Sequence, residues 1–146
     1  MSERSIWNAR DSIDYLQQKT VGRKSTHDCA KFVREAIEAG GVKLNKHHSA
    51  KNYKASLITA GFLSLGSAAG RYLPGDIIII ESSPGHPHGH IALYDGTKWI
   101  SDFPQRNMLH MYPEQSARQS GMLNYTIYRY GIRWDSIVGP RHSDLA

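Results

Sequence analysis

The sequence contains a single cysteine, Cys29, among its 146 residues, so no disulfide can form within the chain. It has no apolar run that approaches the roughly 20 residues of a membrane-spanning helix. Residues 1–10 are polar and lack the apolar stretch and cleavage site of a secretory signal, so we expect synthesis in the cytoplasm without Sec export. The chain also lacks low-complexity segments and solenoid repeats. These absences argue against disulfide-stapled, transmembrane and repeat architectures.

The composition that remains is that of an ordinary globular protein, with 40% hydrophobic and 21% charged residues. We expect one catalytic domain over residues 1–146, with a core over about 5–132 and a flexible C-terminal tail. The formal net charge of +5 favours an anionic partner. Because the basic residues are scattered rather than gathered in a stripe, we expect no nucleic-acid binding. We expect no membrane insertion, because no apolar run is long enough to span a bilayer.

Apolar residues at helical spacing predict three helices in the first half of the chain. The first begins at Ile6, with Ser5 as its N-cap, and ends near residues 21–22. The second begins near Cys29, where Ser25, Thr26 and Asp28 are available as caps, and ends at residues 40–41. The third covers about 49–60 and ends at Gly61. Cys29 therefore falls in the first turn of a helix.

The second half of the chain predicts strands at 77–80, 90–94, 98–103 and 124–130. The first of these is a continuous β-branched run, typical of a strand buried on both faces. Asp95-Gly96 marks a hairpin that pairs 90–94 with 98–103. Helices followed by strands indicate an α+β domain in which N-terminal helices pack on one face of an antiparallel sheet.

Cys29 has two interpretations. A free cysteine is most often a small buried hydrophobe. At a helix N-terminus, however, unpaired backbone N–H groups and a nearby imidazole lower a thiol pKa and favour the nucleophilic thiolate. The polar residues that precede Cys29 favour the second interpretation, which predicts a cysteine hydrolase.

His90 is the candidate general base, because it follows Gly89 and begins an apolar strand that would hold its ring in place. An alternative is a metal-binding module built on His86, His88 and His90, which alternate along the chain. Pro87 and Gly89 make a regular extended ligand set doubtful, so we predict no metal and no cofactor. His86 and His88 are then expected at the mouth of the cleft, with His88 in contact with substrate.

A third polar group usually orients such a base, and the hairpin offers two candidates. A three-residue loop would place Asp102 opposite His90, whereas a two-residue loop would place Ser101 there. Asp102 is favoured because a carboxylate stabilises an imidazolium, with Ser101 as the alternative. Gln105 is predicted to contact substrate or its oxyanion, and Asp28 is predicted to contact substrate.

Three short segments together resemble a known family. Residues 28–33 open a helix with Asp-Cys-Ala-Lys-Phe-Val, Pro-Gly-Asp at 74–76 precedes an apolar strand, and residues 89–94 read Gly-His-Ile-Ala-Leu-Tyr. This pattern resembles the NlpC-type and CHAP cysteine amidases, papain-like enzymes that cleave amide bonds in bacterial peptidoglycan. With the segment at 99–103, it is similar to the amidase effectors that bacteria inject through type VI secretion.

The resemblance implies a papain-like fold and an amidase or endopeptidase acting on peptidoglycan stems in the periplasm of a target cell. It implies Cys29 as nucleophile, His90 as general base and acid, and Asp102 or Ser101 as third member. A cognate immunity protein is the expected partner besides peptidoglycan. A phage-type lysin with the same chemistry is the alternative biological setting.

Overall fold

The computed structural model describes residues 6–24, 28–47, 49–67, 71–82, 88–105 and 124–131. Its helices precede its strands, as the sequence predicts. They are α1 (Ala9–Thr20), α2 (Cys29–Ala39), the 3-10 helix η1 (Ala50–Tyr53) and α3 (Lys54–Ala60). The strands are β1 (Phe62–Ser64), β2 (Ile77–Ile80), β3 (His90–Tyr94), β4 (Trp99–Ile100), β5 (Pro104–Gln105) and β6 (Tyr125–Tyr130).

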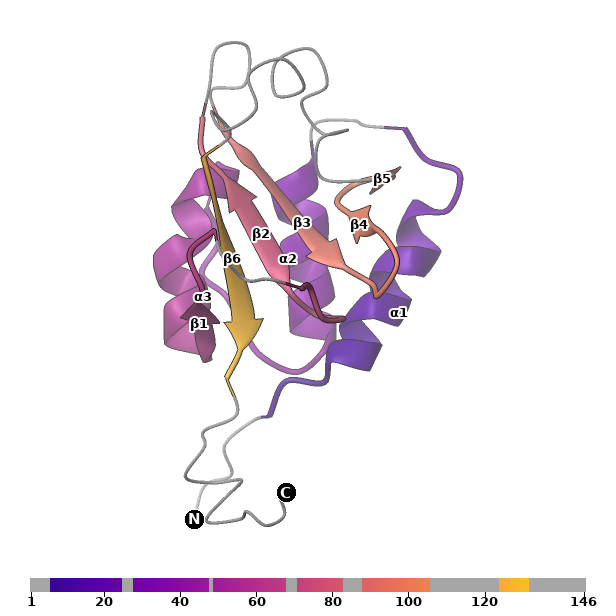
Figure 1. Ribbon diagram of the computed structural model, residues 1–146. Helices are drawn as coiled ribbons and strands as arrows, with labels where there is room; N and C mark the ends of the chain where they lie inside the picture. The colour runs from indigo at the N-terminus through magenta and orange to yellow at the C-terminus, as the bar shows by residue number, and fades with distance from the viewer. Residues whose placement is uncertain are drawn as a thin grey trace.

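The strands form one antiparallel sheet in the order β1-β6-β2-β3-β4-β5. Helices α1, α2 and α3 cover the same face of this sheet (Figure 1). The predicted α+β fold, with helices on one face of an antiparallel sheet, is therefore confirmed. Strand β3, which begins with His90, lies in the interior of the sheet, and α2 packs directly against it.

Strand β2 is buried on both faces, as its unbroken isoleucine run predicts. Ile77 and Ile79 point into the cluster beneath the helices, while Ile78 and Ile80 belong to a second cluster on the other face. This alternation follows from the two-residue period of a strand. The fully buried side chains fix the register of β2 against β3, because a slip of one residue would exchange the two faces.

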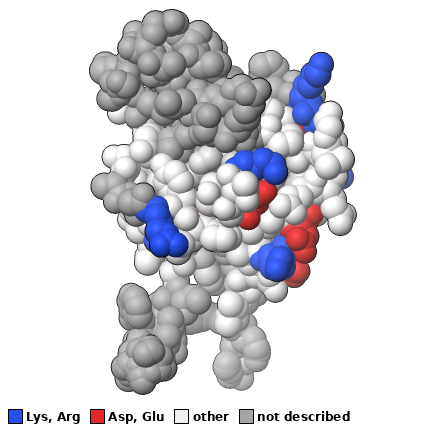
Figure 2. Space-filling model, turned by 45° about the vertical axis from the view of Figure 1, so that its right-hand side comes forward, with Lys and Arg blue, Asp and Glu red and all other residues white. Residues whose placement is uncertain are grey.

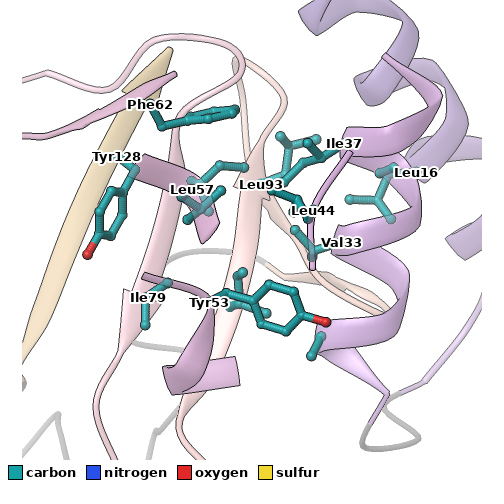
Figure 3. Packing of buried hydrophobic residues seen from close by; sticks show 14 of the residues in the cluster. Leu16, Val33, Ile37, Leu44, Tyr53, Leu57, Phe62, Ile79, Leu93 and Tyr128 are labelled. Carbon is teal, nitrogen blue, oxygen red and sulfur yellow. The ribbon is translucent and has the colours of Figure 1, made fainter. Parts of the chain in front are cut away.

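The larger cluster joins the helices to the sheet (Figure 3). Leu16 of α1 and Val33 and Ile37 of α2 are fully buried against it, and Leu93 of β3 meets them from the sheet. Burial of each such side chain contributes about 1.5–3 kcal/mol. These contacts seat the first turn of α2, and with it Cys29, over the start of β3.

The predicted beginning of the first helix is wrong. Asn8, not Ser5, is the N-cap, and its side chain accepts a hydrogen bond from the Asp11 N–H at 3.0 Å. Ser5 lies outside the described residues. Ile6 is 73% exposed, whereas Trp7 is buried and donates from Nε1 to the Ser12 hydroxyl at 2.8 Å. The aromatic ring has taken the buried position that the helical spacing assigned to Ile6.

The third predicted helix is present in two parts, η1 and α3, and ends as expected at Gly61, whose φ of 112° only glycine adopts readily. The sequence did not predict β1, which follows immediately. This strand has three residues and pairs with β6, more than sixty positions away along the chain. A segment so short shows no measurable period, and its pairing is set by tertiary contacts alone.

Candidate active site

Helix α2 begins at Cys29, with Asp28 in the N-cap position. The Asp28 side chain makes no cap hydrogen bond to the helix. Its backbone N–H instead donates to Oδ2 of Asp102 at 3.0 Å, and its carbonyl accepts from the Phe32 N–H at 3.0 Å. The Asp102 carboxylate therefore fixes the residue before Cys29. Ser25 and Thr26, the other predicted caps, lie outside the described residues.

The hairpin between β3 and β4 has neither of the predicted registers. Tyr94 pairs with Trp99 and Leu93 with Ile100, so four residues separate the two strands. The Asp95 side chain holds this longer turn by accepting hydrogen bonds from the N–H groups of Thr97 and Lys98, both at 2.8 Å. Strand pairing therefore places neither Asp102 nor Ser101 opposite His90.

The predicted strand over 98–103 is also shorter than expected. Strand β4 ends at Ile100, and the chain turns over residues 101–103 to pair β5 against β4. The Ser101 N–H donates to the Phe103 carbonyl at 3.0 Å across this turn. Ser101 and Asp102 are nevertheless buried, at 0% and 1% exposure, because the turn folds against the start of α2.

Asp102 is held in this turn by several contacts. Its Oδ1 accepts from the Ser101 hydroxyl at 3.2 Å, and its Oδ2 accepts from Asp28. Its carbonyl accepts from Nε of Arg23 at 3.2 Å, and the Arg23 guanidinium lies 4.6 Å from the Phe32 ring centroid. Asp102 therefore lies next to the helix that carries Cys29, as predicted, but it is placed there by a turn and not by strand register.

The backbone of Ile91 contributes to the site. The Tyr94 N–H donates toward β2, to the Asp76 carbonyl at 2.8 Å. Since N–H groups alternate sides along an antiparallel strand, the Ile91 N–H points toward β4. Strand β4 ends opposite Leu93 and does not reach Ile91. The Ile91 N–H instead forms a hydrogen bond with the Cys29 sulfur.

The ionisation of Cys29 differs from the prediction. Burial raises the pKa of the thiol to about 11, and the Asp102 carboxylate also raises it. Hydrogen bonds from the N–H groups of Ile91, Ala30 and Cys29 itself act in the opposite direction but do not offset burial. Cys29 is therefore a protonated thiol at neutral pH, and the helix N-terminus alone does not make it a thiolate.

Cys29 lines a pocket of about 590 Å³. The pocket lies between the start of α2, the segment that leads into η1, and His88. Nδ1 of His88 lies 2.6 Å from the Ser49 hydroxyl, and the His88 carbonyl accepts from the Lys51 N–H at 3.1 Å. The structure thus places His88 and Asp28, two of the predicted substrate contacts, on the wall of the pocket that contains Cys29.

His90 is the first residue of β3 and pairs with Ile80 of β2. It immediately precedes Ile91, whose N–H bonds to the Cys29 sulfur. It is half-buried. Gln105 of β5 pairs with Trp99 of β4, and its side chain is not among the described parts of the structure. His86 lies there too, and no group of three metal-ligating side chains occurs within the described ranges. No signal in the sequence singles out Ile91, because its contribution is a backbone group.

A cysteine in the first turn of a helix that packs on an antiparallel sheet, beside the start of a histidine-bearing central strand, defines the papain-like class of α+β fold. Comparisons with family models and with curated proteins give no match. Among solved structures, the chain matches the type VI native effector–immunity complex Tae3–Tai3 from Ralstonia pickettii. The identity is 40% over 86% of this chain and 100% of that chain, with a TM-score of 0.74.

A second structure of that complex, with selenomethionine, matches at 42% identity over 81% of this chain and 98% of that chain, with a TM-score of 0.68. The chain belongs to the Tae3 family of type VI effectors, and the predicted resemblance to these effectors is confirmed. Ly7917, solved with the hydrolyzing product of MDP, matches at 16% identity over 86% of this chain and 64% of that chain, with a TM-score of 0.51. This third likeness concerns the fold alone.

Proposed function

We propose that this protein is an antibacterial effector that hydrolyses an amide bond in peptidoglycan peptide stems with Cys29 as nucleophile. The observation that carries the proposal is the position of the Cys29 sulfur. It lies at the start of α2 and takes hydrogen bonds from the backbone of Cys29, Ala30 and Ile91. Membership of the Tae3 family and the three motifs around Cys29 and His90 support peptidoglycan as the substrate.

The first half of the reaction transfers the acyl group to the enzyme. His90 accepts the thiol proton, and the Cys29 sulfur attacks the carbonyl carbon of the stem amide. The C–N bond then breaks, His90 gives its proton to the leaving amine, and a thioester remains. Because the thiol pKa is about 11, proton removal by His90 has to accompany the attack. The backbone N–H groups around the sulfur are suited to hold the oxyanion.

The second half releases the acyl group. Water attacks the thioester with His90 as base, the C–S bond breaks, and the products are a carboxylate and the regenerated thiol. Asp102 is proposed as the third member, with Ser101 as the alternative. The two are hydrogen bonded to each other, and Asp102 also fixes the residue before Cys29. Asp102 would therefore orient the nucleophile's helix as well as the base.

The proposed setting is the periplasm of a target cell, with a cognate immunity protein as partner. The Tae3 relative was solved with its immunity protein Tai3. No helix of the described residues is long and apolar enough to cross a bilayer. On the face that Figure 2 shows, basic side chains lie apart from one another, some beside acidic ones. The positive net charge of +5 is expected to aid approach to the anionic wall.

Digestion of purified sacculi tests the proposal. Cys29→Ala should release no muropeptides by liquid chromatography and mass spectrometry, while the wild-type protein releases them. The substitution removes one sulfur atom that borders the pocket, so the variant should keep the wild-type circular dichroism spectrum and serve as its own folding control. His90→Ala should lose the same activity. Undiminished release by folded Cys29→Ala would reject cysteine catalysis.

A further inference from the structure

The pocket beside Cys29 carries an excess of positive charge. Three basic side chains, Lys31, Arg34 and Lys46, line it together with the acidic Asp28 and Glu35. They come from two parts of the chain, because Lys31 and Arg34 belong to α2, whereas Lys46 lies in the segment between α2 and η1. Substrate bound at Cys29 therefore shares the pocket with cationic groups from two segments of the chain.

Arg34 and Glu35 are already engaged within the protein. Arg34 forms an ion pair with Glu38 at 3.1 Å and lies 4.0 Å from Glu35. Glu35 also accepts a hydrogen bond from the Tyr15 hydroxyl at 3.2 Å. Lys31 and Lys46, in contrast, have no ion-pair partner among the described residues, and both are exposed. With Asp28 as the remaining acidic lining residue, these two lysines leave the pocket with a net positive charge.

The remaining wall is largely apolar. Ala30, Ala50 and the Tyr53 ring line the pocket, and Ala50 and Tyr53 are almost fully buried. The Tyr53 hydroxyl donates to the His47 carbonyl at 3.1 Å and accepts from the His47 N–H at 2.9 Å. An aliphatic segment that ends in an anionic group fits this combination of apolar wall and cationic rim.

We propose that Lys31 and Lys46 form a carboxylate subsite, which binds a free carboxylate of the peptide stem close to the scissile amide. The subsite makes the enzyme prefer acidic stems over stems in which that carboxylate is amidated. This inference rests on the proposed function, which brings the stem to Cys29. Charge-assisted hydrogen bonds of about 1.5 kcal/mol correspond to about a tenfold preference.

Steady-state hydrolysis of two matched muropeptides tests the subsite, one with free stem carboxylates and one with the carboxylates converted to carboxamides. The wild-type KM should be about tenfold lower for the acidic substrate. In Lys31→Gln/Lys46→Gln this preference should fall to near one, with kcat little changed. Lys43→Gln removes an exposed lysine of the same segment that does not line the pocket, and should keep the wild-type preference.

Calorimetric binding to Cys29→Ala separates the two proposals. The acidic muropeptide should bind that variant about tenfold more tightly than its carboxamide, and the added lysine substitutions should remove the difference. This measurement needs no turnover, so it gives the same answer if cysteine catalysis fails. An unchanged preference in the double lysine variant, or an equal loss in Lys43→Gln, would overturn the subsite.

Discussion

Replacing Gly89 by alanine should damage the active site through the backbone alone. Gly89 has a φ of +72°, and a Cβ at this position would overlap the Ile80 carbonyl oxygen and come within 3.3 Å of the Lys51 Cβ. Ile80 is the pairing partner of His90, so relief of this overlap has to separate β2 from β3 where His90 begins. The substitution should therefore lower the stability of the fold and displace His90, the proposed base, at the same time.

A matched control variant separates the cost of the left-handed backbone conformation from the cost of the steric clash. Gly22 has a nearly identical φ of +74°, but a Cβ there meets nothing within 4 Å. Gly22→Ala should lower the free energy of unfolding by about 1 kcal/mol, the cost of a left-handed backbone for an L-residue. Gly89→Ala should lower it by about 3 kcal/mol, because a steric clash with rigid backbone is added.

Urea unfolding measures the difference. With a slope of about 2 kcal/mol per molar, the unfolding midpoint of Gly89→Ala should lie about 1 M below that of Gly22→Ala. Muropeptide release, assayed without denaturant, should fall in Gly89→Ala and remain near wild type in Gly22→Ala. Equal midpoints for the two variants would refute the argument, since they would show that β2 and β3 accommodate the added methyl group without cost.

Three further predictions concern buried ionisable groups. Asp76→Ala should lower the free energy of unfolding by about 2–4 kcal/mol in urea titrations. The reason is that the buried Asp76 carboxylate pairs with Nε and Nη2 of Arg129, both at 2.9 Å. A loss under about 0.5 kcal/mol would contradict this. In His90→Ala, iodoacetamide should alkylate Cys29 with an apparent pKa of about 11, and a value under 9 would show that the backbone N–H groups suffice to form the thiolate. The folded thiol keeps its proton where the unfolded one loses it, so wild-type stability relative to Cys29→Ser should fall as pH rises from 9 to 11.

The sequence predicted the elements whose burial follows a regular period. Helix α2 and strands β2 and β3 begin and end within about a residue of expectation, because their apolar residues face one core. The register of the β3–β4 hairpin differs from both predicted registers, which place two or three residues in the turn that Asp95-Gly96 marks. Asp95 instead acts through its side chain, which accepts two backbone N–H groups and extends the turn to Lys98. Such side-chain contacts have no periodic signature.

For the candidate site, the sequence predicted that Asp102 lies near the helix of Cys29 but not the contacts that hold it there. Asp102 lies beside the start of α2, but its Oδ2 accepts from the Asp28 N–H rather than reaching the site across a strand pair. The pKa of Cys29 moves in the opposite direction to the prediction, because burial of the thiol in the folded protein outweighs the effect of the nearby backbone N–H groups. Burial of this kind is a tertiary property that the residues near Cys29 in sequence do not report.

The early end of β4 explains why the site forms at this point of the sheet. Had β4 continued in its observed register, Ile91 would face Asp102, and the Ile91 N–H would bond to the Asp102 carbonyl. Because the chain turns after Ile100, both groups acquire other partners. The Asp102 carbonyl accepts from Arg23, and the Ile91 N–H bonds to the Cys29 sulfur. A single broken backbone pair thus provides both an N–H group for the nucleophile and a buried position for the carboxylate beside it.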